Sequence, residues 1–248
     1  MFDKFLSKVG VGAAKVDTIL QETSVVRGGH LLGEIHMTGG KVNQDVKRVY
    51  LELYTHYTYE NEEGHRVTNT CVLHALDIDE SFSLLANEEV VYDFELEVPF
   101  ETPVSLGKTK VYLKTGLDVD WAFDPKDKDE IEVLPEPATE AILTTIEELG
   151  FEHSNESGTC IEMENPVGIP FVQNFTLIGR EGLGSEIEAL DLLILANEHQ
   201  AEVQAEIDKR ERGFGNRANH DRVQLNFSLA HDADFDADTL ASILRQAL

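Results

Sequence analysis

Apolar and polar residues alternate along several segments of this chain of 248 residues. In segment 49–57, Leu51 and Leu53 share one face, and polar or tyrosine side chains occupy the positions between them. Segments 92–98 and 201–207 repeat the same period of two. This period is typical of strands with one buried and one solvated face, which pair into antiparallel sheets. The pattern therefore predicts sheets packed into β-sandwiches.

Turn-forming residues divide the chain into further strands. Gly39 and Gly40 end one strand, and 60–64 reverses the chain between two others. The predicted strands of the first half are 31–37, 49–57, 66–73, 92–98, 109–119 and 131–134. Those of the second half are 160–163, 170–178, 187–195, 201–208 and 223–229.

The character of the chain changes at 134–137, where two prolines interrupt the strands. Beyond this point, apolar residues recur at helical spacing from Ala138 to Leu149. Glu140 falls in the first turn, and Gly150 follows where a left-handed C-terminal residue is expected. A helix of about three turns is therefore predicted at the domain boundary.

Two further segments show helical spacing of apolar residues, 2–9 at the start and 238–248 at the end. Asp236 or Asp238 can cap the last helix. The predicted fold class is dominated by β-structure, with two antiparallel β-sandwich domains and three short helices. The predicted divisions are an N-terminal sandwich with its leading helix (1–135), a connecting helix (136–150) and a C-terminal sandwich with its terminal helix (151–248).

The chain is strongly acidic, with 47 aspartate and glutamate residues against 20 lysine and arginine residues and a net charge of −27. Such a surface repels nucleic-acid backbones and anionic lipid headgroups, so we expect no nucleic-acid partner. The acidity favours an interpretation as solubility, or as adaptation to a salty cytoplasm, over a functional acidic surface.

No segment approaches the roughly 20 apolar residues of a membrane span. The first helix carries an acid in its first turn, unlike a signal peptide, although weak peripheral membrane contact through it stays open. Cys71 and Cys160 are the two cysteines, which favours reduced thiols over a disulfide scaffold. We therefore expect a cytoplasmic protein without a transmembrane segment.

Two glycine-rich strings resemble nucleotide-binding loops but lack their context. Segment 10–15 precedes a predicted strand and has no third glycine, whereas a dinucleotide loop follows a strand and opens a helix. Segment 107–109 ends like a phosphate loop, yet Thr102 stands where the first glycine is required, and a strand follows. A Gly-x-Ser-x-Gly elbow is absent from the sequence, and we predict no catalytic residues and no cofactor.

Histidines and aspartates also raise the question of a metal. His56, His65 and His74 straddle a predicted hairpin, but two rings without further ligands make a poor zinc site. The alternating aspartates of 232–238 suggest calcium, yet Ala237 stands where the calcium loop requires glycine. We predict no metal site, while an irregular cation site in 232–238 stays open.

The densest basic cluster is 209–217, on a glycine-punctuated turn after a predicted strand. One interpretation is a surface loop, and a second is an anion- or partner-binding loop. A third is structural, because arginines paired with carboxylates fix the orientation of two domains. The candidate residues for partner binding or for this interdomain pairing are Arg210, Arg212 and Arg217 with Asp124, Asp127 and Asp129.

Taken in order, several short stretches resemble the sporulation-control family of bacterial proteins. They are 9–18, 33–57, 102–104, 107–111, 114–119, 124–125, 148–151, 170–173 and 208–213. The resemblance implies two arrestin-like β-sandwich domains and a regulatory role, with no known catalytic activity and no cofactor. The chain departs from the family pattern at 27–29, which reads Arg-Gly-Gly instead of Pro-Gly-acidic, and at Glu211, which interrupts the arginine-rich segment.

The sequence thus favours a non-enzymatic intracellular regulator or scaffold whose partners are other proteins. Such a protein can bind an extended segment at an exposed strand edge, with the 210–217 loop setting specificity or domain angle. Alternatives are a metal-dependent hydrolase and a small-ligand or carbohydrate-binding module, for which the single tryptophan, Trp121, is a weak indication. Homo-oligomerisation stays open.

Overall fold

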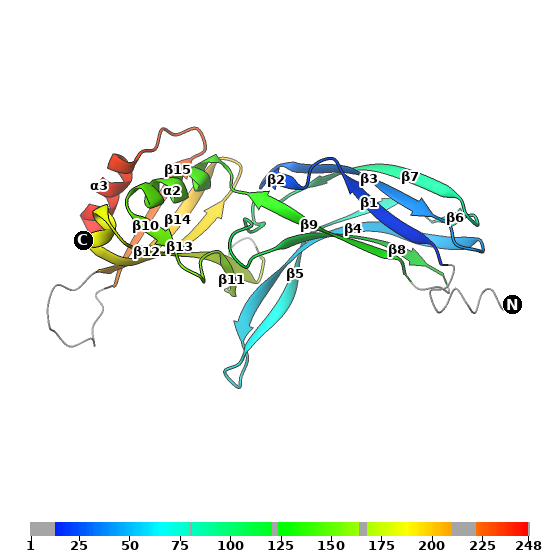
Figure 1. Ribbon diagram of the computed structural model, residues 1–248, viewed down its shortest axis with the longest axis horizontal. Coiled ribbons are helices and arrows are strands. Elements are labelled where there is room, and N and C mark those ends of the chain that lie inside the picture. Colours follow the sequence, from blue (N-terminus) through cyan, green and yellow to red (C-terminus); the bar gives the residue numbers. More distant parts are fainter. Residues whose placement is uncertain (1–12, 80, 121–123, 164–167, 210–221, 248) are drawn as a thin grey trace. The chain divides into compact units, whose positions relative to one another are not determined.

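The computed structural model describes residues 13–79, 81–120, 124–163, 168–209 and 222–247. Within these ranges the protein is mostly β-structure (Figure 1). The described residues form two α-helices. The helix predicted at 2–9 lies outside the described residues. Among the described helices, none has the length and apolar composition that crossing a membrane requires.

The chain divides into two compact units. Unit 1 contains the described residues up to Thr55, together with Thr70–Pro99 and Lys110–Val133. Unit 2 contains His56–Asn69, Phe100–Thr109 and the described residues from Leu134 onward. The chain therefore passes between the units several times.

Unit 1 contains an antiparallel three-stranded sheet in the order β1-β3-β7. Its strands are β1 (Lys15–Leu20), β3 (His30–Thr38) and β7 (Glu89–Glu97). Burial alternates along β1 and β3, as the period of two requires. The register places Ile35 of β3 opposite Thr18 of β1 and opposite Tyr92 of β7.

A second sheet of unit 1 is built around β4, whose part up to Thr55 belongs to this unit. Strand β8 pairs antiparallel with both β4 and β9, and β2 lies next to β9. The bounds are β2 (Ser24–Val26), β4 (Gln44–Glu60), β5 (Arg66–Asp79), β6 (Phe82–Leu84), β8 (Val111–Val119) and β9 (Lys126–Leu134).

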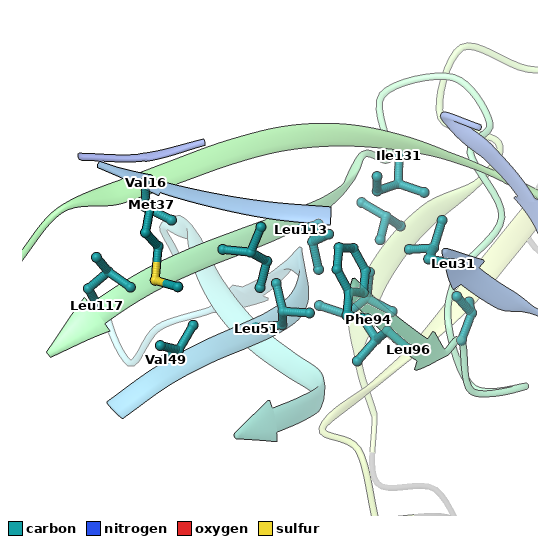
Figure 2. Packing of buried hydrophobic residues seen from close by; sticks show 14 of the residues in the cluster. Val16, Leu31, Met37, Val49, Leu51, Phe94, Leu96, Leu113, Leu117 and Ile131 are labelled. Atoms are coloured by element: carbon teal, nitrogen blue, oxygen red, sulfur yellow. The ribbon is translucent and has the colours of Figure 1, made fainter. Parts of the chain in front are cut away.

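The two sheets of unit 1 contribute to one hydrophobic core. Val16, Ile35 and Met37 of the three-stranded sheet belong to the same buried cluster as Leu51 and Leu113 of the second sheet. Figure 2 shows Val16, Met37, Leu51 and Leu113 among the side chains that lie between these strands. The apolar face predicted for segment 49–57 is therefore the core face of β4.

Unit 2 contains the sheet of the second half of the chain, in the order β15-β14-β13-β12 with β10 and β11 on β12. Both α-helices pack in this unit, α2 against β14 and α3 against β15. The bounds are β10 (Phe151–His153), β11 (Thr159–Glu162), β12 (Phe171–Gly179), a 3-10 helix η1 (Gly182–Ser185), β13 (Ile187–Ala196), β14 (Gln200–Lys209), β15 (Arg222–Ala230), α2 (Pro137–Glu148) and α3 (Ala237–Ala247).

The two helices begin and end close to their predicted positions. The backbone N–H of Thr139 donates to the carboxylate of Glu136, which caps α2. Gly150 has φ of 91°, the left-handed conformation expected after the helix. For α3, the N–H of Thr239 donates to Asp236 Oδ1 at 2.8 Å, so Asp236 is the cap. The hydrogen bonds with Thr239 lower the pKa of Asp236 below its usual range.

Candidate partner-binding surface

A small pocket opens at one end of the three-stranded sheet of unit 1, with a volume of about 260 Å³. Here the chain leaves β1, forms β2 and turns back into β3, and the N–H of Gln21 donates to the carbonyl of Leu32 at 2.9 Å. The lining residues are Gln21, Glu22, Ser24, His30, Leu31 and Leu32. Apolar and polar groups therefore meet in one pocket, as is usual for a binding site.

Glycines hold the turn that precedes the pocket strand β3. The N–H of Gly28 donates to the carbonyl of Val98, and the N–H of Val98 donates to the carbonyl of Gly29, each at 2.8 Å. Gly28 has φ of 84°, and a Cβ on Gly29 would lie 2.8 Å from the carbonyl oxygen of Val26. Both positions therefore require glycine. The Arg-Gly-Gly variation seen in the sequence thus forms a tight turn that is tied to the end of β7.

The outward face of the three-stranded sheet is strongly acidic. Alternate residues of β1, β3 and β7 point away from the core, as their burial shows. We call this set the acidic face: Lys15, Asp17, Ile19, His30, Leu32, Glu34, His36, Thr38, Glu89, Val91, Asp93, Glu95 and Glu97. It carries six carboxylates and one lysine.

Large apolar side chains are exposed within this acidic face. Ile19 is 48% exposed and Leu32 is 41% exposed. Ile19 lies opposite Glu34, two residues from Leu32 on β3, so the two apolar residues occupy diagonal positions on neighbouring strands. Leu32 also lines the pocket and lies opposite Glu95 of β7. An apolar spot bordered by carboxylates therefore adjoins the pocket.

The outward face of β4, β8 and β9 has a different composition. We call this set the tyrosine face: Arg48, Tyr50, Glu52, Tyr54, Tyr112, Lys114, Gly116, Asp118, Lys126, Lys128, Glu130 and Glu132. Four basic and four acidic residues balance its charge. It corresponds to the polar and tyrosine side that the sequence predicts for segment 49–57.

Side chains of the tyrosine face are paired with one another. Lys114 Nζ lies 2.6 Å from Glu52 Oε2. Lys128 Nζ lies 3.5 Å from the ring centroid of Tyr112, a cation–π contact. Gly116 lets the ring of Tyr50 cross β8, because a Cβ there would lie 2.3 Å from Tyr50 Cζ. Three of the four cations of this face thus lie against a carboxylate or a tyrosine ring.

Comparison with known proteins places this fold in a family. The family model of the SpoOM protein, named Spo0M, matches residues 2–211. The chain belongs to the Spo0M family. The sporulation-control protein Spo0M of Bacillus subtilis (strain 168) is 35% identical over 215 residues, which cover 86% of this chain and 82% of that protein. The crystal structure of Spo0M from Bacillus subtilis matches with a TM-score of 0.78 and 27% identity, covering 95% of this chain and 98% of that one.

Two stretches of the resemblance to the Spo0M family, 102–104 and the first part of 107–111, have a clear structural role in unit 2. The side-chain amide of Gln173 accepts from the N–H of Val104 at 2.9 Å and donates to the carbonyl of Val104 at 2.8 Å. Thr109 donates its hydroxyl to the carbonyl of Gly158, and Lys108 pairs with Glu156 at 3.0 Å. The string that resembles a phosphate loop therefore fastens the loop before β8 to the β10–β11 turn.

Of the predicted aspartates, Asp127 and Asp129 share the face of β9 that also carries buried Ile131. Asp127 Oδ2 accepts from the N–H of Thr18 at 2.8 Å, so it binds the edge of β1 that faces away from β3. Asp129 Oδ2 is buried and has no hydrogen-bond partner among the described residues. Burial, together with the charges of Asp127 and Asp17, raises the pKa of Asp129 to about 6.

The third predicted aspartate, Asp124, accepts from the N–H of Val119 at 3.2 Å. This hydrogen bond ties Asp124 to the last residue of β8. The predicted partners Arg210, Arg212 and Arg217 lie outside the described residues. Pairing of these arginines with the aspartates stays a prediction.

The described residues contain no cluster of three or more histidine, cysteine, aspartate or glutamate side chains able to hold a metal. One Ser-His-Glu arrangement occurs in unit 2. His153 Nδ1 lies 2.7 Å from Ser157 Oγ, and His153 Nε2 lies 3.6 Å from Glu147 Oε1. Burial lowers the pKa of His153, and Ser157 is only 3% exposed. A substrate carbonyl cannot approach such a hydroxyl, so the arrangement is a structural hydrogen bond.

Sequence reasoning missed the pocket because no motif marks it. Its lining comes from the loop after β1, the first residue of β2 and the start of β3, and a backbone hydrogen bond joins the loop to β3. One signal was available in the alternation of β3, where Leu32 shares its side with Glu34 and His36. An apolar residue on the polar side of a strand predicts an exposed apolar side chain that a partner can contact.

Proposed function

We propose that this chain is a non-enzymatic regulatory or scaffold protein in the control of sporulation, and that it acts by binding other proteins in the cytoplasm. Membership of the Spo0M family and similarity to a sporulation-control protein support the regulatory role. We further propose that the predicted divisions, 1–135 and 151–248 with the helix at 136–150 between them, are two arrestin-like β-sandwich domains. The alternating burial of the strands supports this architecture.

The acidic face is the observation that carries the proposal of protein binding. It exposes Ile19 and Leu32 next to a pocket, and carboxylates surround both residues. Exposed apolar residues with a polar rim are typical of surfaces that contact other proteins. The tyrosine face is a weaker candidate, because three of its four cations already contact a carboxylate or a tyrosine ring of the face.

The proposal can be tested by affinity purification from native cells with wild type and two variants. The first variant, Ile19→Glu with Leu32→Glu, replaces the apolar spot by charge. The control variant, Val72→Glu, changes an equally exposed apolar residue on β5 of the same unit. We expect the first variant to lose its specific partners by about tenfold or more, since buried anchor residues carry most of the binding energy. The control variant should retain them.

Two results would contradict the proposal. Equal recovery of partners by wild type and the Ile19/Leu32 variant would rule out this surface. A stoichiometric metal in the purified protein, together with hydrolase activity, would favour the enzyme alternative over the binding protein.

A further inference from the structure

We infer that the pocket of unit 1 receives one apolar side chain of a short partner segment rich in lysine or arginine. The inference rests on the proposed function and specifies the chemistry of the partner. It starts from the size of the pocket, about 260 Å³, which is below the usual range for drug-sized ligands. A space of this size suits a single leucine- or phenylalanine-sized group. Leu32 supplies an outward-pointing apolar side chain to its lining, whereas the side chain of Leu31 points into the core of unit 1.

Carboxylates surround the position of this anchor residue. Glu22 lines the pocket itself, and Glu95 lies opposite Leu32 across the β3–β7 pair. Glu34 is the next outward residue of β3 after Leu32, and Asp93 lies opposite it. Residues that flank an apolar anchor in a bound segment would therefore meet negative charge on more than one side.

The charge of the acidic face selects a cationic partner. Its six carboxylates are accompanied by one lysine and two histidines, and the histidines lie at 2.7 Å from Glu34 (His36) and 3.9 Å from Glu95 (His30). The whole chain carries −27, so the field of the protein attracts a basic segment and repels an acidic one. The tyrosine face offers no such contrast, because its charges balance.

The apolar and the charged groups contribute differently to the binding free energy. Burial of a leucine-sized side chain contributes about 2 kcal/mol, which corresponds to a change in affinity of roughly thirtyfold. Contacts between exposed charges contribute less and weaken with salt. We therefore expect the anchor to decide specificity, and the carboxylates to decide the association rate and the salt dependence.

The test uses the full chain and fluorescence anisotropy with short labelled peptides. The first peptide has one central leucine flanked by lysines, the second has alanine in place of the leucine, and the third has glutamates in place of the lysines. We expect the alanine peptide to bind about tenfold more weakly than the leucine peptide, and the glutamate peptide to show no binding. Affinity for the leucine peptide should fall as the salt concentration rises.

Three variants locate the site. Leu32→Glu should weaken binding of the leucine peptide by tenfold or more, while Val72→Glu should leave it unchanged. The double change Glu34→Gln with Glu95→Gln should weaken binding and reduce its salt dependence, with the fold checked by circular dichroism. Shifts of the backbone amide signals of Gln21, Ser24 and Leu32 in NMR spectra should accompany saturation by the peptide.

Equal binding of the leucine and alanine peptides would overturn the inference, because it would indicate general attraction to an acidic protein. Equal binding by wild type and the Leu32 variant would also overturn it. If the peptides fail while the Ile19/Leu32 variant still loses its cellular partners, the partner chemistry is wrong and the proposed function stands. If the variant keeps its cellular partners, the proposed function itself fails.

Discussion

The two outward faces of unit 1 differ in how their charges are arranged. On the tyrosine face, a lysine is paired with a glutamate and another lies over a tyrosine ring. On the acidic face, carboxylates outnumber cations, and Ile19 and Leu32 are exposed among them. Charged side chains can therefore pair with one another within a single face. A face with unbalanced charge and exposed apolar groups instead presents groups that a binding partner can contact.

The two faces also differ in how deeply their side chains are buried. Tyr50 is only 8% exposed although it points away from the core, because Gly116 gives its ring a flat surface and Arg48 lies 4.6 Å above it. The tyrosine face thus acts as a second packed layer that contributes to stability. The acidic face contributes little packing, so we expect its changes to affect binding more than folding.

Of the changes on the two outward faces, the largest expected effect on stability is on the tyrosine face. Gly116→Ala places a methyl group 2.3 Å from Tyr50 Cζ, which forces the ring or the strand to move. Overpacking of this kind costs about 1–3 kcal/mol. Urea denaturation should show the loss, and Thr38→Ala on the acidic face is the matched control that should change stability little. Unchanged stability of the Gly116 variant would show that Tyr50 is loosely held.

The next effect concerns Asp129, whose pKa rises from 3.8 to about 6 in the folded protein. As pH rises from about 4 to 6, the unfolded chain loses this proton before the folded protein does, so Asp129 lowers the free energy of unfolding over that window. The full shift corresponds to about 3 kcal/mol, which solvent screening of a half-exposed carboxyl reduces to about 1 kcal/mol.

Asp129→Asn should therefore raise the free energy of unfolding by about 1 kcal/mol at pH 7 and leave it nearly unchanged at pH 4. Denaturation curves of both proteins at the two pH values give the comparison. A difference of the same size at both pH values would assign the effect to packing instead of charge.

A smaller difference is expected between matched glutamates of the two faces. Glu52→Gln removes the partner of Lys114, a pair in which both side chains are less than a third exposed, and should cost about 0.5–1 kcal/mol. Glu34→Gln removes one of many carboxylates from the acidic face and should cost nothing or stabilise slightly. Thermal denaturation of both variants at low salt measures the contrast, which should shrink at high salt. Equal losses would mean that the two faces do not differ in charge balance.

A small effect on stability is also expected for Leu32→Glu. Because Leu32 is 41% exposed, the change should stay within about 0.5 kcal/mol in urea denaturation. Leu51→Ala on the core face of β4 provides the contrast and should cost about 2–5 kcal/mol. A large loss for Leu32→Glu would show that this residue supports the fold and not a binding surface.

The alternation of segment 49–57 predicted both faces of β4, because one residue in two must meet the core. The strand is longer than predicted, from Gln44 to Glu60. Its first residues were missed because a register irregularity between Val46 and Arg48 interrupts the period of two. The helices at 137–148 and 237–247 could be predicted because spacing and capping residues agree.

The contacts of the predicted aspartates could not be found in the same way. The sequence suggests arginine partners for Asp127 because opposite charges attract, but the described donor is the backbone N–H of Thr18, which is 109 positions away. Every residue except proline has such a donor, so its identity depends on how the sheets pack. The pocket could not be predicted from the sequence either, because it depends on backbone hydrogen bonds such as that from Gln21 to Leu32.

The hydrogen bond from Thr18 to Asp127 also bears on self-association. An edge strand with open backbone groups invites the same strand of another molecule, and fibril growth requires strands to add on both sides. In unit 1 the carboxylate of Asp127 accepts from the N–H of Thr18 and so occupies the outer edge of β1 at this position. Growth through β1 would first have to displace this carboxylate, which protects that edge against the addition of another strand.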